Sequence, residues 1–216
     1  MKVIITGTTG MIGEGVLLEC LCRADITEVL SVSRRPTGIS HPKLNEYIVP
    51  DFLALKVGDE RLMGYDACFY CAGISSVGVK EDVFTKMIYD TTLHFAKVLQ
   101  PNPSMSFVFV SGGGTDSTEK GNMMWARVKG KTENDLMKLP FKQAFGFRIG
   151  FVVPSPGQKR VLKFYKYISW LVPILKLLTP RLINTMPQVA NAMIKLSKEG
   201  YPNNVIYVKD IHILDR

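Results

Sequence analysis

A glycine-rich segment directly after the first apolar run is the feature that most constrains the fold of this chain. The run KVIIT, residues 2–6, is followed by GTTGMIG, in which Gly7, Gly10 and Gly13 are three residues apart. Glycines at this spacing let a strand turn tightly into a helix and let the backbone approach a diphosphate. The N-terminus of that helix adds free N–H groups and a positive dipole. We therefore predict a dinucleotide-binding loop made of Gly7, Thr8, Thr9, Gly10, Met11, Ile12 and Gly13.

Short apolar runs alternate with helical stretches along the chain. The expected strands are residues 2–6, 28–33, 44–49, 67–71, 106–111, 144–149 and 204–208. The expected helices are residues 11–23, 81–99, 122–138, 160–178 and 187–199. This alternation predicts an α/β fold, a single Rossmann-type doubly wound parallel sheet with helices on both faces. We expect residues 1–216 to form one domain, with a small C-terminal portion, about 156–200, that faces a substrate or partner.

The end of the second expected strand indicates the type of nucleotide. Proteins that bind NAD place an acidic residue about 20 residues beyond the glycines, whereas proteins that bind NADP use arginine there. This chain has SVSRRP at that place, with Arg34, Arg35 and no acidic neighbour. Because a guanidinium group matches a phosphate in shape and charge, we predict NADP in preference to NAD.

The overall charge favours anionic ligands. The chain carries 27 Lys and Arg against 19 Asp and Glu, a net charge of +8. No run of five basic residues and no nucleic-acid motif accompanies this charge. We expect a small-molecule substrate or a protein partner and no nucleic acid. The three histidines lack metal-ligand spacing, so no metal is expected.

Cysteines and apolar stretches bear on location. Cys68 and Cys71 have C-x-x-C spacing but fall within a strand pattern, which favours buried free thiols and a reducing compartment. Glycines interrupt the N-terminal apolar run too early for a signal peptide. We therefore predict a cytoplasmic protein. The apolar stretch 161–178 contains three lysines and Pro173, so we expect no transmembrane helix. Peripheral membrane contact, contact with a partner and a cover over the substrate cleft remain alternatives for it.

Several motifs occur along the chain in the same order as in a known superfamily. They are the spaced glycines, CAGIS after the fourth strand, Ser111 at the end of the fifth, Lys129 in the next helix and FRIGFVVP. Together they resemble the short-chain dehydrogenase/reductase superfamily, and most of all its atypical or extended branch, which includes nucleoside-diphosphate-sugar epimerase-like proteins and NADP-binding regulators. The resemblance covers about residues 1–155. It implies that Ser111 orients a substrate carbonyl or hydroxyl, that Lys129 holds the nicotinamide ribose, and that Cys71, Ala72 and Gly73 lie beside the other ribose.

One position departs from that family. Trp125 stands four residues before Lys129, where the family has its catalytic Tyr. An indole N–H is not an acid or base near neutral pH, so the usual proton relay is absent. Another group could serve instead, and the candidates are Asp116, Tyr89, Ser111 and Thr115. Asp90 also stands near the position of a helix Asn in many members, which leaves that contact open.

Two functions follow from these patterns. The first is an NADP(H)-binding oxidoreductase that acts on a small carbonyl, hydroxyl or sugar-nucleotide compound, with Ser111, Lys129 and Asp116 as its candidate catalytic residues. The alternative is a non-catalytic NADP(H)-binding redox sensor or regulatory interaction protein. A separate possibility is that Trp125 is a packing residue behind a displaced active site.

Overall fold

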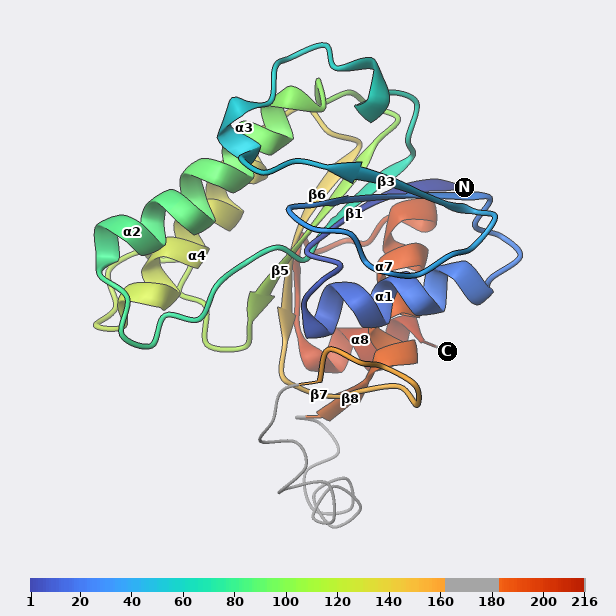
Figure 1. The fold of residues 1–216 in the computed structure, drawn as a ribbon. Helices are drawn as coiled ribbons and strands as arrows, with labels where there is room; N and C mark the ends of the chain where they lie inside the picture. The colour runs from blue at the N-terminus through green and yellow to red at the C-terminus, as the bar shows by residue number, and fades with distance from the viewer. Residues whose placement is uncertain (162–182, 216) are drawn as a thin grey trace.

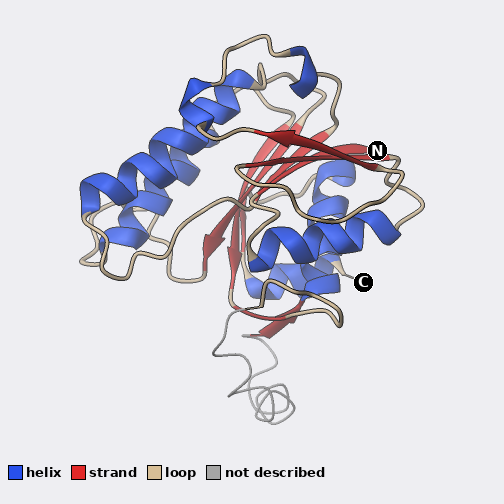
Figure 2. Ribbon diagram, in the orientation of Figure 1, coloured by secondary structure: helices blue, strands red, loops and turns tan. Residues whose placement is uncertain are grey.

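A seven-stranded parallel sheet forms the centre of the molecule (Figures 1 and 2). The computed structural model describes residues 1–161 and 183–215. Neighbouring strands follow the order β3-β2-β1-β4-β5-β6-β9. The strands are β1 Lys2–Thr6, β2 Glu28–Ser33, β3 Leu44–Ile48, β4 Ala67–Tyr70, β5 Ser106–Gly112, β6 Gln143–Ile149 and β9 Val205–Ile206. The order reverses between β1 and β4, and such a switch point is where open α/β sheets bind their ligands.

Helices cover both faces of this sheet, which confirms the predicted doubly wound α/β fold. One side carries α1 (Met11–Cys22), α7 (Met186–Glu199) and α8 (Val208–Leu214). The other side carries α2 (Glu81–Thr85), α3 (Thr91–Val98) and α4 (Met124–Leu136). Strands β1, β2, β4, β5 and β6 are mostly buried and therefore read as nearly continuous apolar runs, whereas the edge strand β3 is partly exposed.

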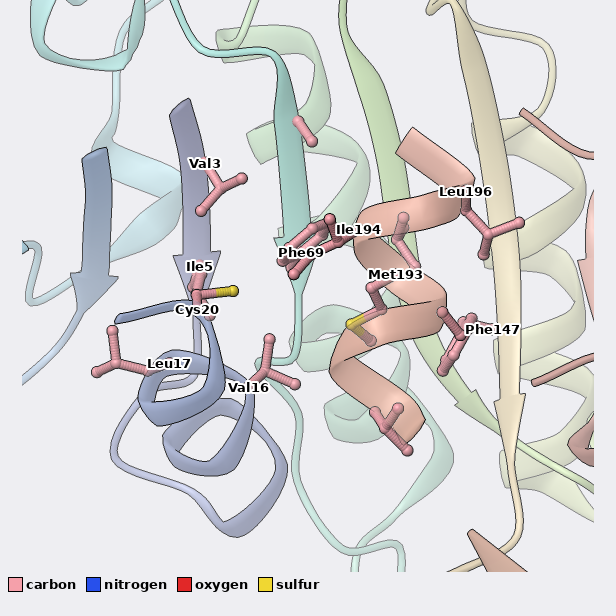
Figure 3. Packing of buried hydrophobic residues seen from close by; sticks show 14 of the residues in the cluster. Val3, Ile5, Val16, Leu17, Cys20, Phe69, Phe147, Met193, Ile194 and Leu196 are labelled. Atoms are coloured by element: carbon pink, nitrogen blue, oxygen red, sulfur yellow. The ribbon is translucent and has the colours of Figure 1, made fainter. Parts of the chain in front are cut away.

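Two apolar clusters separate the sheet from its helices. On the α1 side, Val16 and Leu17 of α1 and Met193 of α7 pack with Phe69 and Phe147 of the sheet (Figure 3). Close approach of α1 and α7 depends on a glycine, because a Cβ atom at Gly15 would lie 2.5 Å from the Met186 side chain. The opposite cluster is rich in aromatic rings from β4, β5 and α3. Both faces of the sheet are thus closed by apolar packing.

The helix expected over residues 81–99 is divided into three segments. A π-helical turn, η3 (Lys86–Asp90), separates α2 from α3. Turns of this type occur mostly as single insertions and are frequent at functional sites. Periodicity alone did not reveal it, because one widened turn hardly changes the apolar pattern of a helix.

The C-terminal elements also differ from the expectation. Strand β9 is shorter than the expected strand 204–208, because the Tyr207 backbone N–H donates to the Asp210 carboxylate and the chain starts α8 there. A small parallel pair that the sequence did not predict, β7 (Phe151–Val153) and β8 (Ile183–Thr185), follows β6. The expected helix 160–178 lies almost wholly outside the described residues. Within the described part of the chain, no helix has both the length and the apolar character to cross a membrane.

Candidate functional site

The glycine-rich loop between β1 and α1 is closely packed at the carboxyl end of the sheet. Gly7 has a φ of +68°, and a Cβ atom on it would lie 2.7 Å from the Ala72 nitrogen. At Gly13 a Cβ atom would lie 2.3 Å from the Gly7 carbonyl oxygen. Gly10 caps α1 and donates its N–H to Gly7 O at 2.9 Å. Among the described residues, no side chain caps this start of α1, so none of them occupies its first N–H groups, which could bind an anion.

Hydroxyl groups hold this loop against the neighbouring strands. The Ala72 N–H donates to Thr6 Oγ1 at 3.1 Å, which ties the end of β1 to the segment after β4. Thr8 Oγ1 and Ser31 Oγ are 2.7 Å apart and buried. The Thr8 hydroxyl is therefore engaged inside the protein, and what Thr8 can present to a phosphate is its backbone. These contacts fix the backbone of the loop between β1 and α1.

A cavity of about 320 Å³ lies beside the end of β2 and is called the Arg34 cavity below. Its lining includes Arg34, Asp51, Phe52, Gly73 and Lys86. Within the described part of the chain, the side chains of Arg34 and Lys86 form no hydrogen bond or ion pair, so two cations face this space without a partner. Arg35 does not line the cavity, although the sequence treats the two arginines alike. Lys86, Asp51 and Phe52 carry no sequence signal that we recognised.

A second cavity of about 470 Å³, the Ser111 cavity, adjoins the first. Ala72, Gly73 and Ile74 line both, so together the two cavities form a groove along the carboxyl edge of the sheet. The structure thus brings most of the predicted site residues together here. The Ser111 cavity is lined by Gly10, Met11, Ile12, Cys71, Ser111 and Lys129, and also by Ile149, Gly150 and Val152.

Ser111 belongs to a buried polar network that the sequence did not predict. Its Oγ donates to Glu133 Oε1 at 2.5 Å. The Glu133 carboxylate also accepts from Arg148 Nε at 3.1 Å, and the two side chains form a buried ion pair. Arg148 Nη1 donates in turn to the Tyr207 hydroxyl at 3.1 Å. A charged residue inside the apolar run FGFRIGF was the available signal, and Glu133 one turn after Lys129 was the other.

Lys129 points into the same cavity from α4. Among the described residues its Nζ forms no hydrogen bond or ion pair, although it lines the cavity beside Ser111. Burial lowers the pKa of Lys129, and the nearby Glu133 carboxylate opposes this shift. A cation in such a position can bind a hydroxyl or an anion, and it can release a proton more readily than a solvated lysine.

Trp125 lies outside this cavity. Its ring covers the loop after β5, where Cβ atoms on Gly112 and Gly114 would lie 3.5 Å and 2.9 Å from the indole. It packs against the apolar cluster on the α4 side and lines neither cavity.

Asp116 is likewise outside the groove, because it organises its own loop. Its carboxylate accepts from the Thr118 N–H at 2.9 Å, the Thr118 hydroxyl at 2.7 Å and the Gly121 N–H at 2.7 Å. These hydrogen bonds lower the pKa of Asp116. The structure therefore does not bring Asp116 together with Ser111 and Lys129.

The remaining candidates for proton transfer also face other partners. Tyr89 donates its hydroxyl hydrogen to Asp135 at 2.7 Å, and this hydrogen bond, together with burial, raises the pKa of Tyr89 to about 12. Thr115 Oγ1 accepts from the Gly112 N–H at 3.2 Å. Cys71 does line the cavity, but burial raises its pKa to about 12. None of the three is a suitable acid or base at neutral pH.

Comparison with known sequences gives distant relatives. No family model matches the chain. It is 25% identical over 163 residues to a protein of Meyerozyma guilliermondii named FMP52, mitochondrial, and 25% identical over 166 residues to the Emericella nidulans protein of that name. The matches cover 71% and 74% of this chain, and 66% and 70% of the relatives' own length.

The names of these relatives correct one prediction. All four curated relatives are named as mitochondrial proteins, so the predicted cytoplasmic location is wrong. Free thiols indicate a reducing environment, and they do not identify a particular compartment.

Comparison with solved structures concerns the fold. A mutated uronate dehydrogenase matches with a TM-score of 0.67 at 14% identity, covering 95% of this chain and 73% of that one. MoeE5 in complex with UDP-glucuronic acid and NAD matches with a TM-score of 0.68 at 18% identity, covering 95% and 75%. A UDP-N-acetylglucosamine 4-epimerase of Methanobrevibacter ruminantium matches with a TM-score of 0.67 at 16% identity, covering 95% and 74%. The chain therefore has the Rossmann-like fold of epimerases and dehydrogenases, which confirms, for the fold, its resemblance to atypical short-chain dehydrogenases/reductases.

Proposed function

We propose that this protein binds NADP(H) along the groove and is an atypical oxidoreductase for a small carbonyl, hydroxyl or sugar-nucleotide compound. The observation that carries the proposal is the glycine cradle at Gly7 and Gly13, which opens onto a groove containing Ser111 and Lys129. A side chain at either glycine would overlap the neighbouring backbone, so the shape of the cradle requires glycine at both positions. Structural neighbours whose names include dehydrogenase and epimerase support the same class.

The choice of NADP rests on the Arg34 cavity. Arg34 and Lys86 both line this space and have no hydrogen-bond or ion-pair partner among the described residues, and a 2′-phosphate would offer them an acceptor. Asp51 also lines the cavity, but its carboxylate accepts the Leu53 N–H at 2.9 Å and begins the short helix η1 (Phe52–Ala54). We therefore assign the adenine end of the nucleotide to the Arg34 cavity and the nicotinamide end to the Ser111 cavity.

In this arrangement each protein group has a defined task. The loop Gly7–Gly13 and the start of α1 bind the diphosphate. Lys129 and Ser111 hold the polar groups of the ligand in the Ser111 cavity, and Ile149 and Val152 exclude water from one side of it. The nicotinamide, when bound, supplies or accepts the hydride.

Binding and turnover measurements test the proposal. Titration calorimetry with NADP⁺ and NAD⁺ is expected to show at least tenfold tighter binding of NADP⁺, since one charge-assisted hydrogen bond contributes about 1.5–3 kcal/mol. NADPH oxidation is then followed against a panel of aldehydes, ketones and keto-sugar nucleotides. Ser111→Ala and Lys129→Ala are expected to abolish any turnover found. Absence of binding to both dinucleotides contradicts the proposal.

A second candidate function is a non-catalytic NADP(H) sensor or regulatory protein. The observation that favours it is the commitment of Asp116 and Tyr89 to contacts outside the groove, with Trp125 in place of the family's Tyr. Tight NADP(H) binding without turnover across the whole panel would select this function.

A further inference from the structure

The Ser111 hydroxyl has a fixed polarity in this protein. A serine hydroxyl has one hydrogen to donate and two lone pairs to accept with. Ser111 directs its hydrogen at Glu133 Oε1, 2.5 Å away and buried. The ion pair with Arg148 keeps that acceptor in place as a carboxylate. Any further hydrogen bond at the Oγ atom, including one from a ligand in the Ser111 cavity, must therefore be accepted by its lone pairs.

A hydrogen-bond acceptor at this point cannot polarise a carbonyl oxygen. It suits a donor, such as a ligand hydroxyl or an ammonium group. The family resemblance gives the Ser hydroxyl either role, but the geometry selects the accepting one. The proton for a substrate oxygen must therefore come from another group that lines the cavity.

Lys129 is the lining group best suited to this task, because the hydroxyl of Ser75, which also lines the cavity, carries no charge. Of the described side chains that line the Ser111 cavity, it is the one with a formal charge. Its ammonium has no hydrogen bond or ion pair among the described residues, so its three N–H donors are available. Trp125, Asp116 and Tyr89 all lie on other surfaces, as their contacts show.

We propose that Lys129 is the proton donor of this site, and that Ser111, held by Glu133 and Arg148, accepts the hydrogen bond that orients the substrate hydroxyl or the Lys129 ammonium. The inference rests on the proposed function, whose oxidoreductase class it makes specific. In the roles implied by the family resemblance, the Ser hydroxyl donates a hydrogen bond to the substrate and the Lys acts through a Tyr. Here Ser111 accepts a hydrogen bond and Lys129 donates the proton itself.

In carbonyl reduction, the hydride comes from the nucleotide and the proton comes from Lys129. As the hydride reaches the carbonyl carbon, the C=O π electrons move to oxygen, and an N–H bond of Lys129 breaks as an O–H bond forms. The products are an alcohol, the oxidised nucleotide and a neutral Lys129 amine, which water reprotonates. In alcohol oxidation the neutral amine accepts the hydroxyl proton.

Charges around Lys129 are compatible with this exchange. Glu133 lies one turn further along α4, and Arg148 on β6 faces Glu133. Because Arg148 already neutralises Glu133, the carboxylate offers Lys129 limited stabilisation. Burial, the larger influence, lowers the pKa of Lys129 and brings its proton closer to release at neutral pH. Cys71, from the end of β4, is protonated and uncharged there.

A titration tests this inference without a known substrate. Protein with ¹³C-labelled lysine is titrated between about pH 6 and pH 11 by following the Cε shifts, with and without saturating NADP⁺. Lys129→Arg assigns the Lys129 signal. Lys131, whose ammonium lies over the Tyr89 ring 4.9 Å from its centroid, is the control on the same helix. Lys129 is expected to titrate below the ordinary lysine value of about 10.4 in both states, and titration of Lys129 at or above that value in the NADP⁺-bound protein overturns the proposal.

Variants separate proton transfer from binding of the ribose. Arg at position 129 keeps a cation with N–H donors but does not release a proton. With NADPH and any carbonyl compound of the panel that is reduced, we expect Lys129→Arg to bind NADPH within about threefold of wild type and to lose about 100-fold or more in turnover. Lys131→Arg is expected to change neither. Turnover by Lys129→Arg within tenfold of wild type overturns the assignment.

The experiments distinguish failure of the proposed function from failure of the Lys129 proposal. A protein that does not bind NADP(H) contradicts the function itself, and calorimetry shows this before either test begins. A protein that binds NADP(H) and turns over a panel compound, but whose Lys129 titrates at or above the ordinary lysine value of about 10.4, keeps the proposed function and loses only this inference.

Discussion

Gly13 lies directly against the carbonyl group of Gly7, so closely that a Cβ atom at position 13 would be 2.3 Å from the Gly7 oxygen. That contact joins the first turn of α1 to the end of β1. The atoms that a Cβ at Gly13 would meet belong to the backbone of Gly7 and Thr8, so they could move away only at a large cost in free energy. The tight turn between β1 and α1 therefore depends on two glycines together.

The Gly13→Ala variant is expected to lose about 1–3 kcal/mol of unfolding free energy, the usual effect of overpacking. NADP⁺ binding should weaken at least tenfold, because the loop must shift. Urea denaturation and calorimetry measure the two effects. Gly113→Ala is the control, since a Cβ atom there meets only Ile149 O, at 3.7 Å. Equal behaviour of the two variants would show that the loop tolerates a side chain.

Arg34 and Arg35 are expected to differ although they are adjacent. Arg34 lines the Arg34 cavity and Arg35 does not. We expect Arg34→Ala to weaken NADP⁺ about tenfold or more while changing NAD⁺ little, because only NADP⁺ carries the 2′-phosphate. Arg35→Ala should leave the NADP⁺ to NAD⁺ preference within about twofold of wild type. Calorimetry with both nucleotides decides, and an equal loss of both in Arg34→Ala contradicts the cofactor assignment.

Trp125→Tyr is expected to give no gain in catalysis, although it recreates the family's residue pair with Lys129. The side chain at 125 packs over Gly112 and Gly114 and lines neither cavity. Turnover of a panel compound should stay within about threefold of wild type, and stability should fall by about 1 kcal/mol as packing is lost. A rise of tenfold or more in turnover would mean that the position faces the nicotinamide.

Because of Asp59, the stability of the folded protein is expected to fall as the pH is lowered into the acid range. Hydrogen bonds from Arg61 and from the Tyr47 hydroxyl, against an opposing effect of burial, lower the pKa of Asp59 to about 2. Because the folded value lies below the unfolded value of about 3.9, the stabilisation is complete above the unfolded value and is lost as pH falls from about 4 to 2. Asp59→Asn should therefore be less stable than wild type at pH 7, and the difference should shrink over that interval.

Thermal denaturation at several pH values checks the Asp59 prediction. Asp82→Asn is the comparison, since the exposed Asp82 side chain makes no hydrogen bond or ion pair within the described residues. A difference between Asp59→Asn and wild type that is constant from pH 7 to about pH 2 would exclude the proposed linkage.

The sequence predicted the sheet and the tight turn between β1 and α1 because both depend on local patterns. Buried parallel strands appear as apolar runs, and Gly7, Gly10 and Gly13 mark a turn that few other residues can form. Ser111 and Lys129 were placed together because the ends of successive parallel strands and the following helices meet at one edge of the sheet.

Other parts of the site depend on side-chain direction, which spacing does not determine. Asp116 turned out to accept hydrogen bonds within its own loop, and Trp125 lies on glycines of that loop. The Glu133–Arg148 pair joins α4 to β6, and no local pattern links two such residues. The separation of Arg34 from Arg35 likewise follows from the turn after β2, where Ser33 Oγ donates to Arg35 O at 2.6 Å.

The π-helical turn η3 determines which surface each of its side chains faces. Lys86 and Met87 line the Arg34 cavity, Ile88 lines the Ser111 cavity, and Tyr89 reaches Asp135 on α4. Four consecutive residues thus serve three different surfaces. Removing one residue from the turn would make it an ordinary α-helical turn and rotate the residues before it by about 100° relative to α3. Length, as much as composition, is therefore under constraint in this segment: an insertion or deletion here would change which of its side chains face the two cavities, even if every other residue kept its type.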